Sequence, residues 1–181
     1  MRVITGIARG KRLKTLEGND VRPTTDKVKE GIFSAIQFDI EGRRFLDMFA
    51  GSGQMGIEAL SRGAKSAVFI DSSPAAVKVC TENVSSAGFA EVSRIVKRDS
   101  VGYVTATAET FDIAFLDPPY EAGILINALQ TVSKKMSDYG IIICEHPSDI
   151  DLPKAVDRFS VYRVYRYGKI NVTVYKKENI Q

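Results

Sequence analysis

The fold of this chain is decided at residues 46–53, which read Leu46-Asp47-Met48-Phe49-Ala50-Gly51-Ser52-Gly53. This stretch places a short apolar strand directly before a tight glycine turn, and the pattern from Gln54 to Ser61 then predicts a helix. In an α/β sheet such a turn opens at the carboxyl ends of the strands, where ligands bind. Gly51 and Gly53 let the backbone approach a ligand because no Cβ stands in the way. The stretch predicts a ligand site at this turn, although dinucleotide-binding proteins use similar glycines.

The rest of the chain continues the alternation of strand and helix. Short apolar runs that end in a polar or acidic residue predict parallel core strands at 45–49, 67–71, 93–97, 113–117 and 141–145. Helices are predicted between them, with start signals such as Ser73 followed by Pro74. Both ends depart from this pattern. Residues 4–16 predict a β-hairpin, and residues 159–176 predict two antiparallel strands. A helix is expected from about Asp26 to Ile36, with Thr25 or Asp26 as its cap.

The composition suits one globular domain. The 181 residues are 44% hydrophobic, which is enough for a substantial core, and a second full domain has no room. We expect residues 1–40 to form a hairpin-and-helix extension on a core of residues 41–181. No apolar run approaches the roughly 20 residues that span a bilayer, and no signal peptide is visible, so we expect a cytoplasmic protein with no membrane partner.

The cysteines and the single histidine carry no metal-binding or triad pattern. Cys80 and Cys144 lie far apart among apolar neighbours, which favours buried, reduced thiols over a disulfide or a metal site. His146 has no partner pattern, so we expect it to be structural or exposed in a loop. No metal is expected.

Positive charge is concentrated at the two ends of the chain. Residues 1–16 hold five basic residues and no acid, and residues 158–177 hold six and no acid, which leaves 14 basic against 22 acidic residues elsewhere. Lysine and arginine clustered in this way commonly contact phosphates. The pattern favours a nucleic-acid partner, although solvated charge on edge hairpins gives the same count.

Three aspartates follow successive predicted strands. Asp71 can accept hydrogen bonds from both ribose hydroxyls of an adenosine, Asp99 can meet the adenine amino group, and Asp47 can face the amino-acid part of a cofactor. A cationic sulfonium suits such acids, whereas a pyrophosphate calls for neutral or basic surroundings. Each aspartate alone also fits a helix cap or a solvated strand end. The predicted residues for binding S-adenosyl-L-methionine here are Asp47, Phe49, Ala50, Gly51, Ser52, Gly53, Asp71, Ser72, Asp99 and Ser100.

The fourth core strand ends in Asp117-Pro118-Pro119-Tyr120, which we interpret as a catalytic segment for methyl transfer to an amino group. The amino group of a purine or cytosine is a poor nucleophile because its lone pair is delocalised into the ring. The Asp117 carboxylate and the Pro118 carbonyl can each accept one N–H, and Pro118 and Pro119 stiffen the backbone between the acceptors. Tyr120 can stack on an unpaired base, and Asp117 or water can take the released proton. The alternative is a proline-rich turn after a buried strand.

These segments resemble one known family along nearly the whole chain: the bacterial RsmD-like enzymes, which methylate the exocyclic N2 of a guanine in small-subunit (16S) ribosomal RNA. The glycine turn and the catalytic segment are shared widely among amino methyltransferases, whereas the Arg-Pro-Thr segment is the most family-specific of the matching segments. The similarity lies in Val21-Arg22-Pro23-Thr24-Thr25-Asp26 with Glu30 and Phe33, in residues 47–53, in Glu58-Ala59-Leu60-Ser61-Arg62-Gly63-Ala64, in residues 117–120 and in Tyr167-Gly168.

The resemblance implies a Rossmann-like class I S-adenosylmethionine-dependent methyltransferase fold, with a seven-stranded, mostly parallel sheet and an antiparallel C-terminal hairpin. It implies that residues 22–26 lie over the cofactor and the target base, with Thr24 and Thr25 reaching the cofactor. The implied partner is 16S ribosomal RNA, free or in a partly assembled small subunit, and we expect a monomer. The predicted RNA contacts are Arg9, Lys11, Arg12, Arg22 and Lys27.

Lys27 and Lys29 depart from the family pattern, in which we expect arginine at both positions. Lysine lacks the planar guanidinium fork, which weighs against a bidentate phosphate contact there.

Two other interpretations remain open. The same chemistry can serve an adenine or cytosine of DNA or a glutamine of a protein, although the chain has no length for a separate DNA-recognition domain. A nucleotide-dependent oxidoreductase uses the same strand, turn and helix, but it leaves Asp117 to Tyr120 unexplained.

Overall fold

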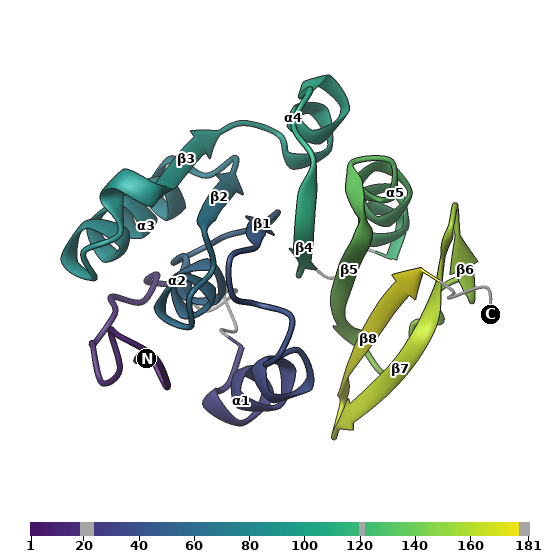
Figure 1. Cartoon of the computed structure of the whole chain (residues 1–181), viewed down its shortest axis with the longest axis horizontal. Helices are drawn as coiled ribbons and strands as arrows, with labels where there is room; N and C mark the ends of the chain where they lie inside the picture. The colour runs from purple at the N-terminus through teal and green to yellow at the C-terminus, as the bar shows by residue number, and fades with distance from the viewer. Residues whose placement is uncertain (19–23, 120–121, 178–181) are drawn as a thin grey trace.

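The computed structural model describes residues 1–18, 24–119 and 122–177, and their strands form one sheet in the order β3-β2-β1-β4-β5-β8-β7-β6 (Figure 1). The first five strands in this order are parallel, and β8, β7 and β6 join them antiparallel. Their bounds are β1 Arg44–Asp47, β2 Ser66–Asp71, β3 Ser93–Lys97, β4 Phe111–Leu116, β5 Met136–Pro147, β6 Ala155–Val156, β7 Phe159–Tyr167 and β8 Ile170–Lys177. The expected α/β fold with a mostly parallel sheet and an antiparallel C-terminal hairpin is confirmed.

The sheet differs from the expected one at its outer edge and in the length of β5. Within the described residues it has eight strands instead of seven, because Ala155 and Val156 add a short pairing to β7. Two residues are too few to show the alternating pattern of a strand. β5 begins at Met136, well before the predicted Ile141, because Met136 pairs with Phe111 ahead of an irregularity in the ladder.

Helices cover both faces of the sheet (Figure 1). Side chains alternate along β1 and β4, so Phe45 and Ile113 pack in one cluster with Ile57, while Leu46 and Ala114 pack in another with Leu129. The first cluster lies under α1, α2 and α3, and the second under α4 and α5. The helices are α1 Asp26–Ala35, α2 Gln54–Ser61, α3 Pro74–Ser86, α4 Ser100–Ala106 and α5 Ala122–Ser133, with a 3₁₀ turn at Ala90–Val92.

The predicted helix caps are present. Ser73 Oγ accepts the N–H of Ala76 at the start of α3, and Thr25 Oγ1 accepts the N–H of Val28 at the start of α1. A side-chain oxygen at this position satisfies a backbone donor that the helix itself leaves unpaired.

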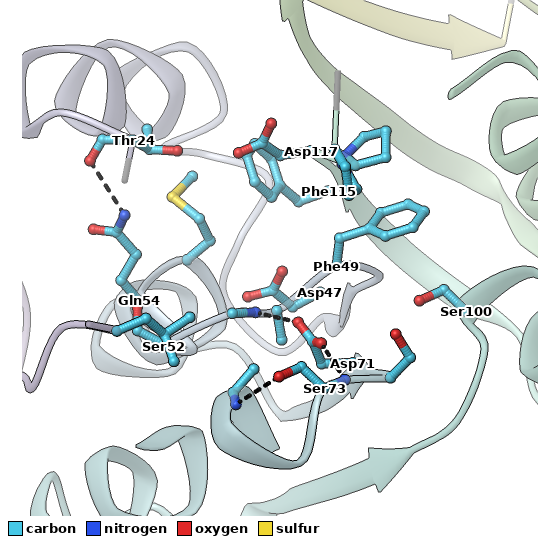
Figure 2. Close-up of a pocket in the computed structure, with 18 of the residues that line it drawn as sticks. Thr24, Asp47, Phe49, Ser52, Gln54, Asp71, Ser73, Ser100, Phe115 and Asp117 are labelled. Atoms are coloured by element: carbon cyan, nitrogen blue, oxygen red, sulfur yellow. Dashed lines mark hydrogen bonds between the residues drawn. The ribbon is translucent and has the colours of Figure 1, made fainter. Parts of the chain in front are cut away.

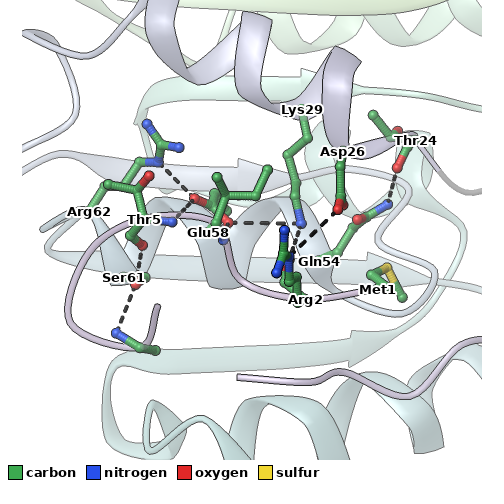
Figure 3. A network of polar contacts seen from close by, with 12 residues as sticks. Met1, Arg2, Thr5, Thr24, Asp26, Lys29, Gln54, Glu58, Ser61 and Arg62 are labelled. Atoms are coloured by element: carbon green, nitrogen blue, oxygen red, sulfur yellow. Dashed lines mark hydrogen bonds and ion pairs between the residues drawn. The ribbon is translucent and has the colours of Figure 1, made fainter. Parts of the chain in front are cut away.

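Residues 1–16, called here the N-terminal strap, fold back on themselves as a short, irregular hairpin over residues 1–13, close to the predicted one at 4–16. An antiparallel bridge joins Arg2 to Arg12, and backbone hydrogen bonds flank it, from Val3 to Lys11 and from Leu13 to Met1. Several other backbone groups of the strap bond to helix side chains (Figure 3). The N–H groups of Ile4 and Thr5 donate to the Glu58 carboxylate at 2.8 and 3.0 Å, and further contacts anchor the strap to α2. The strap therefore satisfies its backbone partly on itself and partly on α2.

The cysteines are buried and free, as predicted. His146 is buried in β5 with its Nε2 2.8 Å from Thr173 Oγ1, which agrees with a structural role. Within the ranges given above, no helix has the length and apolar character needed to cross a membrane.

Candidate active site

The glycine turn joins β1 to α2 in a backbone conformation that favours glycine. Gly51 has a φ of 54° and Gly53 a φ of 81°. A Cβ at Gly53 would lie 2.7 Å from Sγ of Cys80, so a larger residue would strain both the backbone and the core. Gly53 therefore shapes the turn without lining the cavity beside it, whereas Gly51 faces that cavity.

A cavity of about 480 Å³ opens beside this turn (Figure 2). This volume lies within the roughly 300–1,000 Å³ that small-molecule sites occupy. Thr25 does not line the cavity and instead caps α1 with its side chain exposed. The predicted cofactor residues that the cavity brings together are Thr24, Asp47, Phe49, Ala50, Gly51, Ser52, Asp71, Ser72, Asp99 and Ser100.

Several lining residues were not predicted. Some come from the strap, far from the predicted site in sequence, and others stand next to predicted residues, but nothing in their local pattern indicates a ligand. The strap contributes Met1, Thr15 and Leu16, and the remaining unpredicted residues are Gln54, Met55, Ser73, Ala76, Phe115 and Ile124.

Asp71 is fixed at the end of β2 by two backbone donors. One carboxylate oxygen accepts the N–H of Gly51 at 2.9 Å and the other accepts the N–H of Ser73 at 2.9 Å. Each carboxylate oxygen has a second lone pair, so Asp71 can still accept hydroxyl donors from a ligand. The bonds hold its negative charge at the mouth of the glycine turn.

Asp47 is buried at the end of β1 and accepts the N–H of Gly56 at 3.1 Å. Burial, and to a smaller extent the charge of Asp71, raises the pKa of Asp47 to about 7. A cationic ligand group in the cavity would lower that pKa again by stabilising the carboxylate.

Asp99 has a structural role as well as a place in the cavity wall. Its carboxylate caps α4 by accepting the N–H of Gly102 at 2.6 Å, and the side chain is otherwise exposed. Asp99 is therefore a helix cap, which was the alternative interpretation from the sequence. Ser100 beside it is buried.

The charge of the cavity wall fits S-adenosylmethionine. Within the described residues, Asp47, Asp71, Asp99 and Asp117 line it, and no lysine, arginine or histidine side chain does. A sulfonium and an ammonium group are stabilised in such surroundings, whereas a pyrophosphate is repelled. The acidic lining of the cavity thus agrees with the cofactor expected from the sequence.

Asp117 lies directly after β4, at the far wall of the same cavity (Figure 2). Leu116 pairs with Cys144 of β5, so the next residues along these parallel strands, Asp117 and Glu145, are neighbours. Burial, and then the charges of Glu145 and Asp47, raise the pKa of Asp117 well above its ordinary range. Pro118 and Pro119 also line the cavity, and Tyr120 lies outside the described residues.

Glu145 is a site residue that the sequence did not single out. It is buried in β5, and its Oε2 accepts the hydroxyl of Thr24 at 2.8 Å. Gln54 Nε2 donates to the Thr24 carbonyl at 3.2 Å, so both ends of Thr24 are held at the cavity wall. The signal available in the sequence was a lone carboxylate at the end of the apolar run 141–144, where a helix cap or a solvated end is equally common.

The predicted RNA contacts on the strap are exposed, and so is Lys27 on α1. Arg9, Lys11 and Arg12 form no ion pair with any residue that the structure describes, and Arg22 lies outside those residues. Lys29 is buried completely, donates to the Arg2 carbonyl at 2.6 Å and pairs with Glu58 at 3.8 Å. A phosphate cannot reach Lys29, whichever basic side chain stands there.

Comparisons with known proteins place this chain among methyltransferases. A family model described as conserved hypothetical protein 95 matches residues 1–176. "Putative rRNA methyltransferase YlbH" of Bacillus subtilis is 37% identical over 182 residues, which cover 98% of this chain and 99% of that protein. "Ribosomal RNA small subunit methyltransferase D" of Escherichia coli K12 is 29% identical over 180 residues, which cover 98% of this chain and 90% of that one.

A solved structure has the same fold. "Putative methyltransferase yhhF from Escherichia coli" is 28% identical to this chain with a TM-score of 0.89, and the match covers 98% of both chains. The likeness therefore extends over the whole Rossmann-like sheet, including the glycine turn and the segment after β4.

Proposed function

We propose that this chain, which belongs to the family described as conserved hypothetical protein 95 (the RsmD-like enzymes), methylates the exocyclic N2 of a guanine in 16S ribosomal RNA. The observation that carries the proposal is the position of Asp117 and Pro118 at the wall of an acid-lined cavity beside the glycine turn. This arrangement joins an amino-group acceptor to a site for a cationic methyl donor.

The cofactor side of the cavity is formed by the acids at the ends of β1, β2 and β3. S-adenosylmethionine supplies an electrophilic methyl group on a sulfonium sulfur. Asp71, already fixed by two N–H groups, accepts the ribose hydroxyls, and Asp47 faces the ammonium of the methionine part. Asp99 and Ser100 line the same cavity and would meet the adenine amino group.

The target side is formed by Asp117 and Pro118. Their carboxylate and carbonyl oxygens accept the two N–H bonds of the amino group, which favours a pyramidal nitrogen with its lone pair toward the donor. After transfer the nitrogen is positively charged and still holds both of its original protons, one of which must leave. Asp117, whose pKa is raised by burial and neighbouring acids, is a stronger base than an exposed aspartate and can accept that proton.

Ribosomal RNA is supported as the substrate by two independent features. The relatives named above carry ribosomal RNA in their names, and one is assigned to the small subunit. The strap, which forms part of the cavity wall, presents exposed Arg9, Lys11 and Arg12 without acidic partners among the described residues. Phosphates near the cavity would meet these cations first.

The first experiment separates the cofactor classes. S-adenosylhomocysteine at 100 times its dissociation constant should stabilise the protein by about 2.7 kcal/mol, and NAD should not. Stabilisation by NAD alone in a thermal-unfolding assay would contradict the methyltransferase assignment.

The second experiment tests the target. Small subunits from a strain that lacks this protein should gain N2-methylguanine when incubated with the enzyme and the cofactor, as read by mass spectrometry of nucleosides. Asp117→Ala should abolish the product while S-adenosylhomocysteine affinity stays within a few-fold, and Glu91→Ala, at an exposed acid remote from the cavity, serves as the control. A methylated adenine or cytosine instead would overturn the guanine assignment and leave the amino methyltransferase chemistry in place.

A further inference from the structure

Asn83 of α3 joins the cofactor turn to the strap through three hydrogen bonds. Its Nδ2 donates to the carbonyl oxygens of Ser52, at 2.9 Å, and Lys14, at 3.0 Å. Its Oδ1 accepts the N–H of Lys14 at 2.8 Å. Exchanging the amide oxygen and nitrogen would set like groups against each other at all three contacts, so the orientation is determined.

The burial of Asn83 makes these bonds costly to lose. The residue is 1% exposed, so water does not replace a partner that is removed. The other tie between Lys14 and α3, an ion pair with Glu82 at 2.6 Å, lies at the surface, where such pairs contribute little. Asn83 is therefore the main polar link between this part of the strap and the cavity.

The strap residues next to Lys14 form one wall of the cavity. Thr15 and Leu16 line it together with Met1 from the start of the strap. A Cβ on Gly51 would lie 3.7 Å from Leu16 Cδ1, and the Ser52 hydroxyl lies 3.7 Å from Met1 Sδ. The position of this wall over the glycine turn thus depends on how the strap is held.

The remaining strap anchors lie away from the cavity. Ser61 Oγ donates to the Thr5 carbonyl at 2.6 Å and accepts the N–H of Ala8 at 2.9 Å, and Ser61 does not line the cavity. Between the two sets of anchors stand Arg9, Lys11 and Arg12. Any partner bound to these cations acts on the same short segment that Asn83 fixes to the cofactor turn.

We propose that Asn83 is a positioning residue that couples the strap to the cofactor turn, so that cofactor binding and RNA binding to the strap strengthen each other. Such coupling is reciprocal, because each ligand changes the affinity of the other by the same factor. The RNA half of this statement rests on the proposed function. The cofactor half is measured without RNA and without turnover.

The first test measures S-adenosylhomocysteine affinity by calorimetry in Asn83→Ala, Asn83→Asp and the matched strap variant Ser61→Ala. We expect at least a tenfold loss in Asn83→Ala and a larger one in Asn83→Asp, whose carboxylate faces two carbonyl oxygens. Ser61→Ala should lower the melting temperature but keep the affinity within about threefold, because it loosens the strap away from the cavity. Equal losses in Asn83→Ala and Ser61→Ala, or no loss in Asn83→Ala, overturn the proposal.

A second test needs only the unaltered protein and remains informative if the Asn83 variants do not fold. Trypsin cleavage after Arg12 and Lys14 should slow at least fivefold when S-adenosylhomocysteine is bound, because the strap then opens less often. Cleavage after Lys134, an exposed residue at the end of α5, provides the internal control. An equal rate at Arg12 and Lys14 with and without the ligand overturns the coupling.

The third test adds RNA. A 16S fragment should bind at least fivefold more tightly with S-adenosylhomocysteine present, and this ratio should fall to about one in Asn83→Ala. A ratio of one in the unaltered protein overturns the coupling. If no RNA binds while the ligand still protects the strap from trypsin, the proposed function fails and the cofactor role of Asn83 stands.

Discussion

At the scale of single residues, the site depends on how each carboxylate is surrounded. Asp71 is partly exposed at the turn, where two backbone N–H groups hold its carboxylate. Asp47 and Asp117 lie deeper, and burial together with neighbouring acids raises the pKa of both. Similar side chains at successive strand ends therefore lie in different surroundings.

The first prediction concerns Glu145. Its charge is one cause of the raised pKa of Asp117, so Glu145→Gln should lower that pKa while a glutamine oxygen can still accept the Thr24 hydroxyl. If the ionised form of Asp117 is the active one, activity rises with pH through its pKa. The acidic limb of kcat/KM against pH should then move down by about one unit, equivalent to about 1.4 kcal/mol. An unmoved limb in Glu145→Gln would show that another group controls it.

The second prediction concerns stability at Asp47. Its folded pKa of about 7 lies above the ordinary 3.8, so the protonated form is favoured in the folded state. The stabilisation from this carboxyl is complete below about pH 4 and is lost as pH rises through 7. Asp47→Asn, which resembles the protonated form, should therefore be more stable than the unaltered protein at pH 8, by up to about 4 kcal/mol at about 1.4 kcal/mol per unit. The two should unfold alike at pH 4, as measured by denaturant titration.

Asp47→Asn should also bind S-adenosylhomocysteine more weakly, because it removes a negative charge from the cavity. Greater stability together with unchanged affinity would exclude a contact between Asp47 and the ammonium group.

At the scale of elements, α1, α2 and the strap are held together by a buried ionic cluster (Figure 3). Glu58 of α2 and Lys29 of α1 are both fully buried. Arg62 Nε donates to Glu58 at 2.8 Å, and burial lowers the pKa of Lys29 against the opposing effect of Glu58. Glu58 also accepts backbone N–H groups of the strap, and Lys29 donates to a strap carbonyl. The cluster therefore holds α1, α2 and the strap together.

The third prediction follows from that cluster. Glu58→Gln leaves the Lys29 ammonium buried without its charge partner and should cost about 3–5 kcal/mol of unfolding free energy. Adding Lys29→Met removes the unpaired charge, so the double variant should be more stable than the sum of the two single losses predicts. Additive losses in denaturant unfolding would mean that the two residues do not interact.

At the scale of the whole molecule, the basic ends of the chain are not equivalent. In the C-terminal hairpin Arg158 and Lys177 lie within 3.4 and 3.5 Å of Asp138, and Lys176 lies 3.3 Å from Asp39. Arg9, Lys11 and Arg12 of the strap have no such partners among the residues that the structure describes, and the strap that carries them lines the cavity through Met1, Thr15 and Leu16. The strap is therefore the better candidate for phosphate contacts.

The fourth prediction compares the two ends. Reversing Arg9, Lys11 and Arg12 to glutamate should weaken RNA binding and reduce the slope of log affinity against log salt by about three, since each phosphate contact contributes about 0.9. Reversing Arg158, Lys176 and Lys177 should change the slope by less than one. Equal slopes in the two triple variants would show that the strap cations make no special contact with RNA phosphates.

Local sequence was sufficient to predict a helix, a turn or a strand wherever the residues that specify the element lie within it or next to it. The glycine turn predicted the α2 helix at Gln54–Ser61, and the caps at Thr25 and Ser73 stand where they were expected. The parallel core strands follow from apolar runs because buried strands must be apolar on both faces. The acids at the strand ends follow too, because parallel strands present their carboxyl ends at one edge.

Tertiary structure decided what depends on residues far apart in the chain. The local pattern predicted a hairpin in the strap, but it did not predict the strap's bonds to Glu58, Ser61 and Asn83, which lie more than 50 positions away. Glu145 joins the site only because β5 pairs with β4 and Thr24 lies across from it. Sequence by itself determined the parallel core of the sheet and the position of the glycine turn, and it predicted Asp117 as a catalytic residue. The cavity wall that the strap forms depends on contacts between residues far apart in the chain. The raised pKa values of Asp47 and Asp117 depend on burial and on neighbouring acids, and no local pattern encodes either.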